Sequence, residues 1–126
     1  AQELRATRPI SVNRNELQQV LINLMVNALQ AMPEGGTLRL ATGDREDNGI
    51  AGGYVAVGDS GPGISAADRE RLFDPFFTTK STDGTGLGLW VSLGIVQRYG
   101  GRIELDCPPA GGSVFTVWLP NEPTVV

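Results

Sequence analysis

Apolar residues recur at helical spacing in two stretches of the chain. The first stretch, residues 14–32, has one apolar face, which is made by Leu17, Val20, Leu21, Leu24, Ala28 and Ala31. Asn13 or Asn15 can cap this helix, because an asparagine oxygen accepts a free backbone N–H, and Pro33-Glu-Gly35-Gly36 ends it. The second stretch, residues 86–99, is apolar nearly all round, which predicts a buried helix. A short polar helix is predicted between them, at residues 66–72.

Runs typical of β-strands occur at residues 8–12, 37–42, 54–57, 102–105 and 114–119. The polar, glycine-rich residues 43–53 predict a loop or hairpin tip, and Gly111-Gly112 predicts a turn. Residues 73–85 look irregular, and Pro120 ends the fold before a frayed tail at 121–126. Helices and strands interleave without a regular strand–helix–strand repeat. We therefore expect an α+β fold, a two-layer sandwich with a mixed sheet of about five strands and about three helices on one face.

Length and charge exclude several classes of protein. The 126 residues suit one domain, and 10 basic against 14 acidic residues, a net charge of −4, weigh against a nucleic-acid partner. No signal peptide, polybasic amphipathic stretch or apolar run near 18 residues occurs, so we expect a soluble piece without direct membrane contact. The abrupt start at Ala1-Gln-Glu suggests that this domain, residues 1–126, is a fragment of a longer protein.

The chain contains one cysteine and no histidine. Cys107 cannot form an internal disulfide, and no Cys/His cluster exists for zinc, so we expect a structural thiol that is buried or at a strand end. Any chemistry that uses an imidazole must take it from elsewhere.

Asn23 and Asn27 lie four residues apart, so their side chains share one face of the first predicted helix. Gln19 and Gln30 extend this row, which borders the apolar face. Asparagine is a poor helix former, but its neutral amide oxygen can ligate Mg²⁺. Taken alone, the row is explained more simply as a solvated polar face.

Asp59 follows a predicted strand and precedes Gly61 and Gly63. A carboxylate in this place can accept a hydrogen bond from an adenine amino group, and the glycines let the backbone approach a flat ring. Ile64 could pack on that ring. The alternative is an ordinary Asp-Ser-Gly-Pro-Gly turn, which the same residues favour.

A second glycine cluster, Gly84-Thr-Gly86-Leu-Gly88, opens the second long helix. The start of a helix offers free N–H groups and a partial positive charge, which suit a phosphate. Leu89-Trp90 stands where a Walker loop needs Lys-Ser/Thr, and the glycine spacing differs from that of a Rossmann fingerprint. The cluster is therefore a different phosphate loop or only a flexible hinge.

Lys80 lies in the irregular stretch before this cluster, from which it could reach terminal phosphates as a point charge. A lone lysine more often faces solvent. Phe73, Phe76 and Phe77 precede it and predict a hydrophobic anchor at the base of a lid, with binding of another domain as the second interpretation.

Four motifs resemble, in order, the signature boxes of the sensor histidine kinase ATP-binding domain: Asn23-Leu-Met-Val-Asn27-Ala28, Asp59-Ser-Gly-Pro-Gly63, Phe73-Asp-Pro-Phe-Phe77 and Gly84-Thr-Gly-Leu-Gly-Leu89. This domain belongs to the superfamily shared with gyrase, Hsp90 and MutL. The resemblance covers residues 8–120, and Phe76-Phe-Thr-Thr-Lys80 resembles the nitrogen-regulation subgroup. It implies a Bergerat-type sandwich that holds ATP and Mg²⁺ between the helical layer and a lid.

The resemblance also implies a role for each matching residue. Asn27 corresponds to the Mg²⁺ ligand, and Asn23 to a neighbour that supports phosphates or metal-bound water. Asp59 corresponds to the adenine reader, which Ser113 assists through water. Asn23 and Lys80 are the expected catalytic residues. The expected nucleotide-binding set is Asn23, Asn27, Gln30, Asp59, Gly61, Gly63, Ile64, Thr79, Lys80, Gly84, Thr85, Gly86, Leu87, Gly88, Leu89 and Ser113.

Two departures from the superfamily bear on activity. Hydrolysing members carry a glutamate base one turn before the metal-binding asparagine, where this chain has Asn23, which favours transfer to a protein acceptor over hydrolysis. In the family the acceptor histidine lies on a separate dimerisation domain, so we expect this chain alone to bind ATP without phosphorylating itself. A nucleotide-sensing pseudo-kinase and an ATP-hydrolysing superfamily member are the alternatives.

The resemblance finally implies partners and a compartment. The direct partner is the protein's own dimerisation and histidine phosphotransfer domain, and a response regulator is an indirect one. We expect the isolated domain to be a monomer, because the family's dimer interface belongs to the dimerisation helices. The bacterial cytoplasm is expected from the family, which leaves open the stimulus and whether the parent protein is membrane-anchored.

Overall fold

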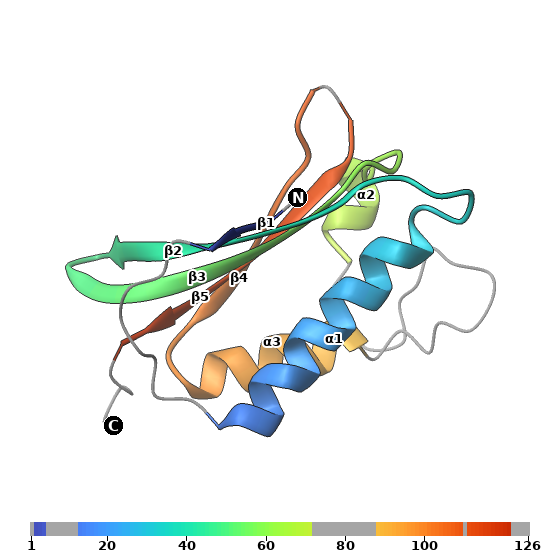
Figure 1. Cartoon of the computed structure of the whole chain (residues 1–126). Helices are drawn as coiled ribbons and strands as arrows, with labels where there is room; N and C mark the ends of the chain where they lie inside the picture. Colours follow the sequence, from blue (N-terminus) through green and yellow to red (C-terminus); the bar gives the residue numbers. More distant parts are fainter. Residues whose placement is uncertain (1, 5–12, 72–87, 110, 122–126) are drawn as a thin grey trace.

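A mixed sheet of five strands forms one layer of the structure (Figure 1). The computed structural model describes residues 2–4, 13–71, 88–109 and 111–121. The strands are β1 (Gln2–Leu4), β2 (Leu38–Asp47), β3 (Ile50–Asp59), β4 (Arg102–Asp106) and β5 (Ser113–Pro120), in the order β1-β2-β3-β5-β4. β1 pairs parallel with β2, and the other neighbours pair antiparallel. The predicted mixed sheet is therefore confirmed.

Two helices lie side by side across one face of this sheet (Figure 1). They are α1 (Arg14–Gln30) and α3 (Gly88–Arg98), whereas α2 (Ala66–Arg69) is a short helix that follows β3. Asn13 caps α1, because its Oδ1 accepts the backbone N–H groups of Asn15 at 2.9 Å and Glu16 at 3.1 Å. The predicted two-layer α+β arrangement is confirmed. No helix among the described residues has both the length and the apolar character needed to cross a membrane.

The core lies between the helices and the sheet. Its buried members come from α1, α3, β3 and β5, and they are Val20, Leu24, Ala28, Val57, Val96, Phe115, Val117 and Leu119. Full burial of one such large apolar side chain contributes about 1.5–3 kcal/mol. This burial decides which face of α1 meets the sheet, and it leaves the row of Asn23 and Asn27 at the border of the core.

The hairpin of β2 and β3 is longer than the sequence pattern predicts. Of the two predictions for residues 43–53, the loop is wrong and the hairpin tip is confirmed, because both strands continue to a turn at Asn48-Gly49. The φ angles of the two turn residues are 49° and 80°, and positive values at both positions are typical of a type I′ hairpin turn.

Two aromatic rings lie so close to these strands that two strand positions have room only for glycine. These glycines make the strands resemble a loop in the sequence. A Cβ on Gly43 would lie 2.6 Å from the Tyr54 ring, and a Cβ on Gly52 would lie 2.6 Å from the Trp118 ring. The rings therefore occupy the space that side chains at the two glycines would need. Glycine is usually depleted in strands, which is why the composition of this stretch favours a loop.

The ends of the chain differ in part from the expectations. The strand predicted at residues 8–12 lies outside the described residues, and β1 supplies the fifth strand. The prediction of fraying from residue 121 is wrong for Asn121, whose backbone N–H donates to the Ala51 carbonyl at 2.9 Å. Residues 122–126 lie outside the described part.

Helix α3 is less buried than its apolar sequence predicts. Trp90 is 48% exposed and Val91 is 39% exposed, because among the described elements α1 and the sheet pack against one side of this helix. The prediction that α3 is buried all round is therefore wrong. Cys107 is a half-buried free thiol directly after β4, as expected for a strand-end cysteine.

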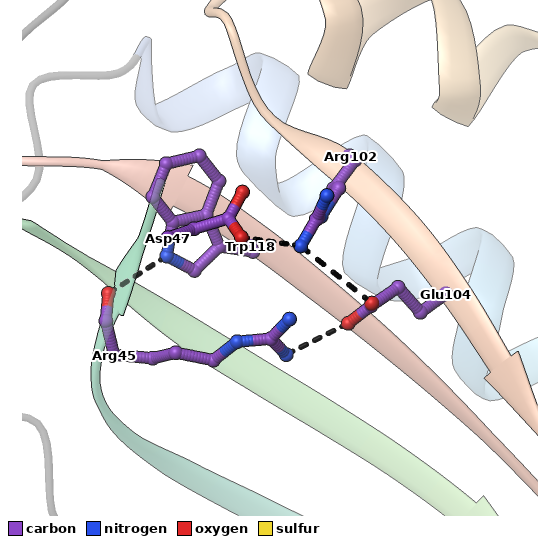
Figure 2. A network of polar contacts seen from close by, with 5 residues as sticks. All are labelled: Arg45, Asp47, Arg102, Glu104 and Trp118. Carbon is purple, nitrogen blue, oxygen red and sulfur yellow. Dashed lines mark hydrogen bonds and ion pairs between the residues drawn. The ribbon is translucent and has the colours of Figure 1, made fainter. Parts of the chain in front are cut away.

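A network of charges covers Trp118 on the sheet face opposite the helices (Figure 2). Trp118 is 3% exposed, and its indole N–H donates to the Arg45 carbonyl at 2.8 Å. The Arg45 guanidinium pairs with Glu104 at 2.7 Å, and Arg102 pairs with Asp47 at 2.5 Å. Because β3 and β5 lie between β2 and β4, these pairs bridge the two central strands.

We expect the substitution Gly52→Ala to destabilise the fold by about 1–3 kcal/mol, the usual cost of overpacking. The new Cβ would lie 2.4 Å from the Leu119 carbonyl oxygen, so backbone must move. Urea denaturation measures the loss. The control is Gly94→Ala in α3, where a Cβ meets no described atom within 4 Å and alanine should add about 0.5–1 kcal/mol. Equal stability of the two variants would contradict this account.

The pKa of Glu104 gives a second test. The hydrogen bond from Arg45, with the charges of Arg45 and Arg102, holds this pKa below its ordinary value. The ionised carboxylate therefore stabilises the fold above the unfolded-state pKa, and the contribution disappears as the pH falls through the lowered folded-state pKa. Glu104→Gln should cost about 0.2–1 kcal/mol at pH ~7, because the pair is partly exposed, and less at pH ~3.

Urea denaturation of Glu104→Gln and the unsubstituted chain at both pH values measures this difference. Glu46→Gln removes the same charge at an exposed position of β2 and is the control. A cost that is equal at both pH values would show that the carboxylate acts by packing alone.

Candidate functional site

Asp59 is held by two hydrogen bonds where β3 ends beside the start of β5. Asp59 and Ser113 are register partners on these antiparallel strands. The Ser113 hydroxyl, on a residue that is 3% exposed, donates to Asp59 Oδ2 at 2.7 Å. The backbone N–H of Gly61 donates to Oδ1 at 2.9 Å. A carboxylate has about four acceptor positions, so each oxygen can accept a further hydrogen bond.

Glycines bring the loop after Asp59 close to neighbouring backbone. A Cβ on Gly61 would lie 2.7 Å from the Ala31 carbonyl oxygen, which belongs to the C-cap of α1. A Cβ on Gly112 would lie 2.2 Å from the Asp59 carbonyl oxygen. Gly63 has a φ of 84°, a left-handed conformation that glycine adopts without strain. These glycines therefore let the loop pack closely against the end of α1 and let the turn before β5 pack against the backbone of Asp59.

A second group of polar side chains joins α1 to the start of α3. The amide nitrogen of Asn23 donates to the Gly88 carbonyl at 3.1 Å and to the Ser92 hydroxyl at 3.0 Å. The Asn23 carbonyl accepts from the Gln19 amide at 2.9 Å. The face that sequence periodicity predicts for the asparagines is thus the face that meets α3.

Asn27 lies on α1 between these two groups. It is half-buried, one turn beyond Asn23 and one turn before Ala31, which contacts the Asp59 loop. Gln30 is exposed at the end of the helix. Gly88 and Leu89 are the first described residues of α3, and the backbone N–H groups at the start of a helix favour an anion.

The two described apolar residues of the predicted site are partly buried. Ile64 and Leu89 both pack against the hydrophobic core. The other predicted site residues lie outside the described part of the chain, namely Thr79, Lys80, Gly84, Thr85, Gly86 and Leu87. The phenylalanine cluster Phe73, Phe76 and Phe77 lies outside it as well.

Sequence reasoning missed Ser92. The available signal was a single hydroxyl residue in an otherwise apolar run of α3. Such a residue normally needs a buried hydrogen-bond partner, but nothing in the local pattern identifies which one.

The chemistry of the described site follows from these groups. One carboxylate with fixed orientation, a row of neutral amides and the start of a helix are arranged along α1. The carboxylate can recognise a donor group, the helix start can bind an anion, and an amide oxygen can ligate a hard cation. No group of three or more acidic, histidine or cysteine side chains suited to a metal occurs among the described residues.

Comparison with known proteins gives a consistent result. Residues 12–123 match the family described as "Histidine kinase-, DNA gyrase B-, and HSP90-like ATPase". The signal transduction histidine-protein kinase AtoS of Escherichia coli K12 is 40% identical over 115 residues, which are 91% of this chain and 18% of AtoS. The C4-dicarboxylate transport sensor protein DctB of Rhizobium meliloti is 49% identical over 115 residues, 85% of this chain and 17% of DctB. The chain thus spans about a fifth of the length of such relatives.

Solved structures agree with the sequence relatives. The catalytic domain of histidine kinase ThkA is 33% identical, with a TM-score of 0.77 over 97% of this chain and 82% of that one. Full-length ShkA in complex with AMPPNP is 27% identical, with a TM-score of 0.78 over 100% of this chain and 26% of that one.

Proposed function

This chain belongs to the family of histidine kinase-, DNA gyrase B- and HSP90-like ATPases as an ATP-binding catalytic domain of the histidine kinase type, and we propose that it binds Mg²⁺–ATP and transfers the γ-phosphoryl group to a histidine on another domain. The acceptor must come from outside this chain, which has no histidine. The observation that carries the proposal is the Asp59 carboxylate, oriented by Ser113 and Gly61.

In this proposal Asp59 reads the adenine. A carboxylate accepts a hydrogen bond from the amino group of adenine. It repels the carbonyl oxygen that guanine has in the same place, which gives a preference for adenine over guanine. The bond from Ser113 keeps one oxygen in a fixed direction, and Gly61 and Gly63 allow a flat ring to approach the backbone. The related ShkA was solved with the ATP analogue AMPPNP, which supports a nucleotide site in this fold.

The phosphates are assigned to the side of the site near α3. The backbone N–H groups of Gly88 and Leu89, in the first described turn of α3, are assigned to an anion, and the Asn27 amide oxygen is a hard oxygen ligand of the type that Mg²⁺ accepts. Bound Mg²⁺ would neutralise phosphate charge during transfer. We assign the preceding segment, which includes Thr79, Lys80 and residues 84–87, to the lid over the phosphates by resemblance to the family.

Transfer is favoured over hydrolysis by the side chain of Asn23. Its amide cannot remove a proton from water, and both described donor bonds of its nitrogen go to α3. Catalysis would then consist of positioning and charge neutralisation, which phosphoryl transfer chiefly requires.

The proposed partners follow from the same reaction. The direct partner is a dimerisation domain with the phosphorylated histidine, and a response regulator receives the phosphoryl group from it. We propose that the isolated domain is a monomer. The bacterial cytoplasm is proposed as its compartment from the family alone.

The direct test supplies the acceptor. Purified chain is mixed with a histidine-bearing dimerisation domain and radiolabelled ATP, and acid-labile label on that domain is measured. We expect transfer that requires Mg²⁺ and occurs only with the histidine domain present. Asn27→Ala should abolish Mg²⁺-dependent ATP binding in calorimetry, and transfer with it, while unfolding by urea stays the same.

Other outcomes identify the other functions. Nucleotide binding without any transfer indicates a nucleotide-sensing pseudo-kinase. Steady release of phosphate without the histidine domain indicates an ATPase. Unchanged Mg²⁺–ATP affinity of Asn27→Ala would refute the metal-binding role of Asn27.

The adenine assignment has its own test in Asp59→Asn. The new amide presents a donor to the adenine amino group, so affinity for adenosine and ADP should fall about tenfold or more, the cost of a charge-assisted hydrogen bond. Binding of inorganic tripolyphosphate should not change. Calorimetry measures both, and Asp106→Asn at an exposed position of β4 controls for net charge. Equal loss of adenosine and tripolyphosphate would show that Asp59 is structural.

A further inference from the structure

We propose that Ser92 is a positioning residue for the triphosphate, because its buried hydroxyl holds Asn23 and so sets the distance between α1 and the first turn of α3. This inference deepens the proposed function and rests on it. Ser92 is too deeply buried, at 0% exposure, to touch a ligand itself. Its effect must pass through Asn23, to which it is bonded at 3.0 Å.

The burial of Ser92 needs an explanation. The other buried residue of α3 is apolar, namely Val96, at 1% exposure. A hydroxyl removed from water costs free energy unless a hydrogen bond replaces the lost water. The bond from Asn23 supplies this replacement, so the hydroxyl and the asparagine are matched to one another.

Asn23 has little freedom to turn. Its nitrogen donates to α3 twice, to the Ser92 hydroxyl and to the Gly88 carbonyl at 3.1 Å, while its oxygen accepts from Gln19. Loss of the Ser92 hydroxyl would leave one N–H of a half-buried amide without its partner. The contact with Gly88 would then be the one described bond between Asn23 and the start of α3.

The spacing of the helices at this end matters for the proposed ligand. Gly88 is the first described residue of α3, and its N–H is among those assigned to phosphate. Asn27, the assigned Mg²⁺ ligand, lies one turn along α1 from Asn23. A triphosphate with its metal must satisfy both groups together, so its affinity depends on how the two helices are spaced.

The far end of the helix pair is held by different groups. Arg98 pairs with Glu16, the Tyr99 hydroxyl donates to Glu16 at 2.6 Å, and the Asn13 N–H donates to that hydroxyl at 3.2 Å. These contacts keep α1 and α3 together when Ser92 is changed. Loss of the bond between Ser92 and Asn23 should therefore change the helix spacing only near the start of α3. The adenine side of the site, at Asp59, should not change.

The experiment compares two ligands on Ser92→Ala by calorimetry: AMPPNP with Mg²⁺, and adenosine. We expect the AMPPNP affinity to fall about five- to tenfold, the effect of one hydrogen bond, with adenosine unchanged. Val96→Ala is the matched control, since it truncates the next buried residue of the same helix. It should lower stability in urea but weaken AMPPNP no more than adenosine.

A double-mutant cycle with Asn23→Ala checks the route of the effect. If Ser92 acts through Asn23, Ser92→Ala should cost nothing further in AMPPNP affinity once Asn23 is alanine. Ser92→Cys retains volume while its sulfur is a weak acceptor, so it replaces Ser92→Ala if alanine prevents folding.

The outcomes separate this inference from the proposed function. Absence of AMPPNP binding by the unsubstituted chain would overturn both. Normal binding there, with AMPPNP and adenosine affected equally or not at all in Ser92→Ala, would overturn the role of Ser92 and leave the proposed function standing. Additive effects of Ser92→Ala and Asn23→Ala would also overturn it.

Discussion

The packing of one face of α1 onto the sheet is the constraint on which the candidate site depends. Val20, Leu24 and Ala28 are buried against the sheet, and this burial fixes the rotation of the helix. Asn23 and Asn27 must then lie at the border of the core, toward α3, because side chains three and four residues apart share a face. The same helix ends where its backbone meets the loop after Asp59, so one packed helix connects both halves of the site.

The two faces of the sheet serve different purposes. The inner face holds the core and places Asp59 beside Ser113, at the end of the sheet where the described site lies. The outer face has its own small cluster, in which Trp118 lies over Gly52 beneath charges from β2 and β4 (Figure 2). The network includes none of the residues assigned to nucleotide. Changes in it should therefore affect stability without changing the site.

Local pattern predicted the helices well and the long hairpin poorly. Helix α1 was recognisable from its apolar period and its asparagine cap, both of which are local properties. The continuation of β2 and β3 to the turn at Asn48-Gly49 was not, because Gly43 and Gly52 look like loop residues until the rings that cover them are known. The exposure of Trp90 on α3 could not be predicted either, because an apolar sequence does not show how many sides of a helix are packed against other elements.

The sequence by itself determined the family and the α+β class and predicted the residues of the candidate site, because glycine clusters, an acid after a strand and paired asparagines are local patterns. Only the tertiary structure decided what those residues contact. Asn23 meets a serine 69 positions away, and Asp59 meets one 54 positions away. Hydrogen bonds over such separations depend on how helices and strands pack, and local propensity contains no information on that packing.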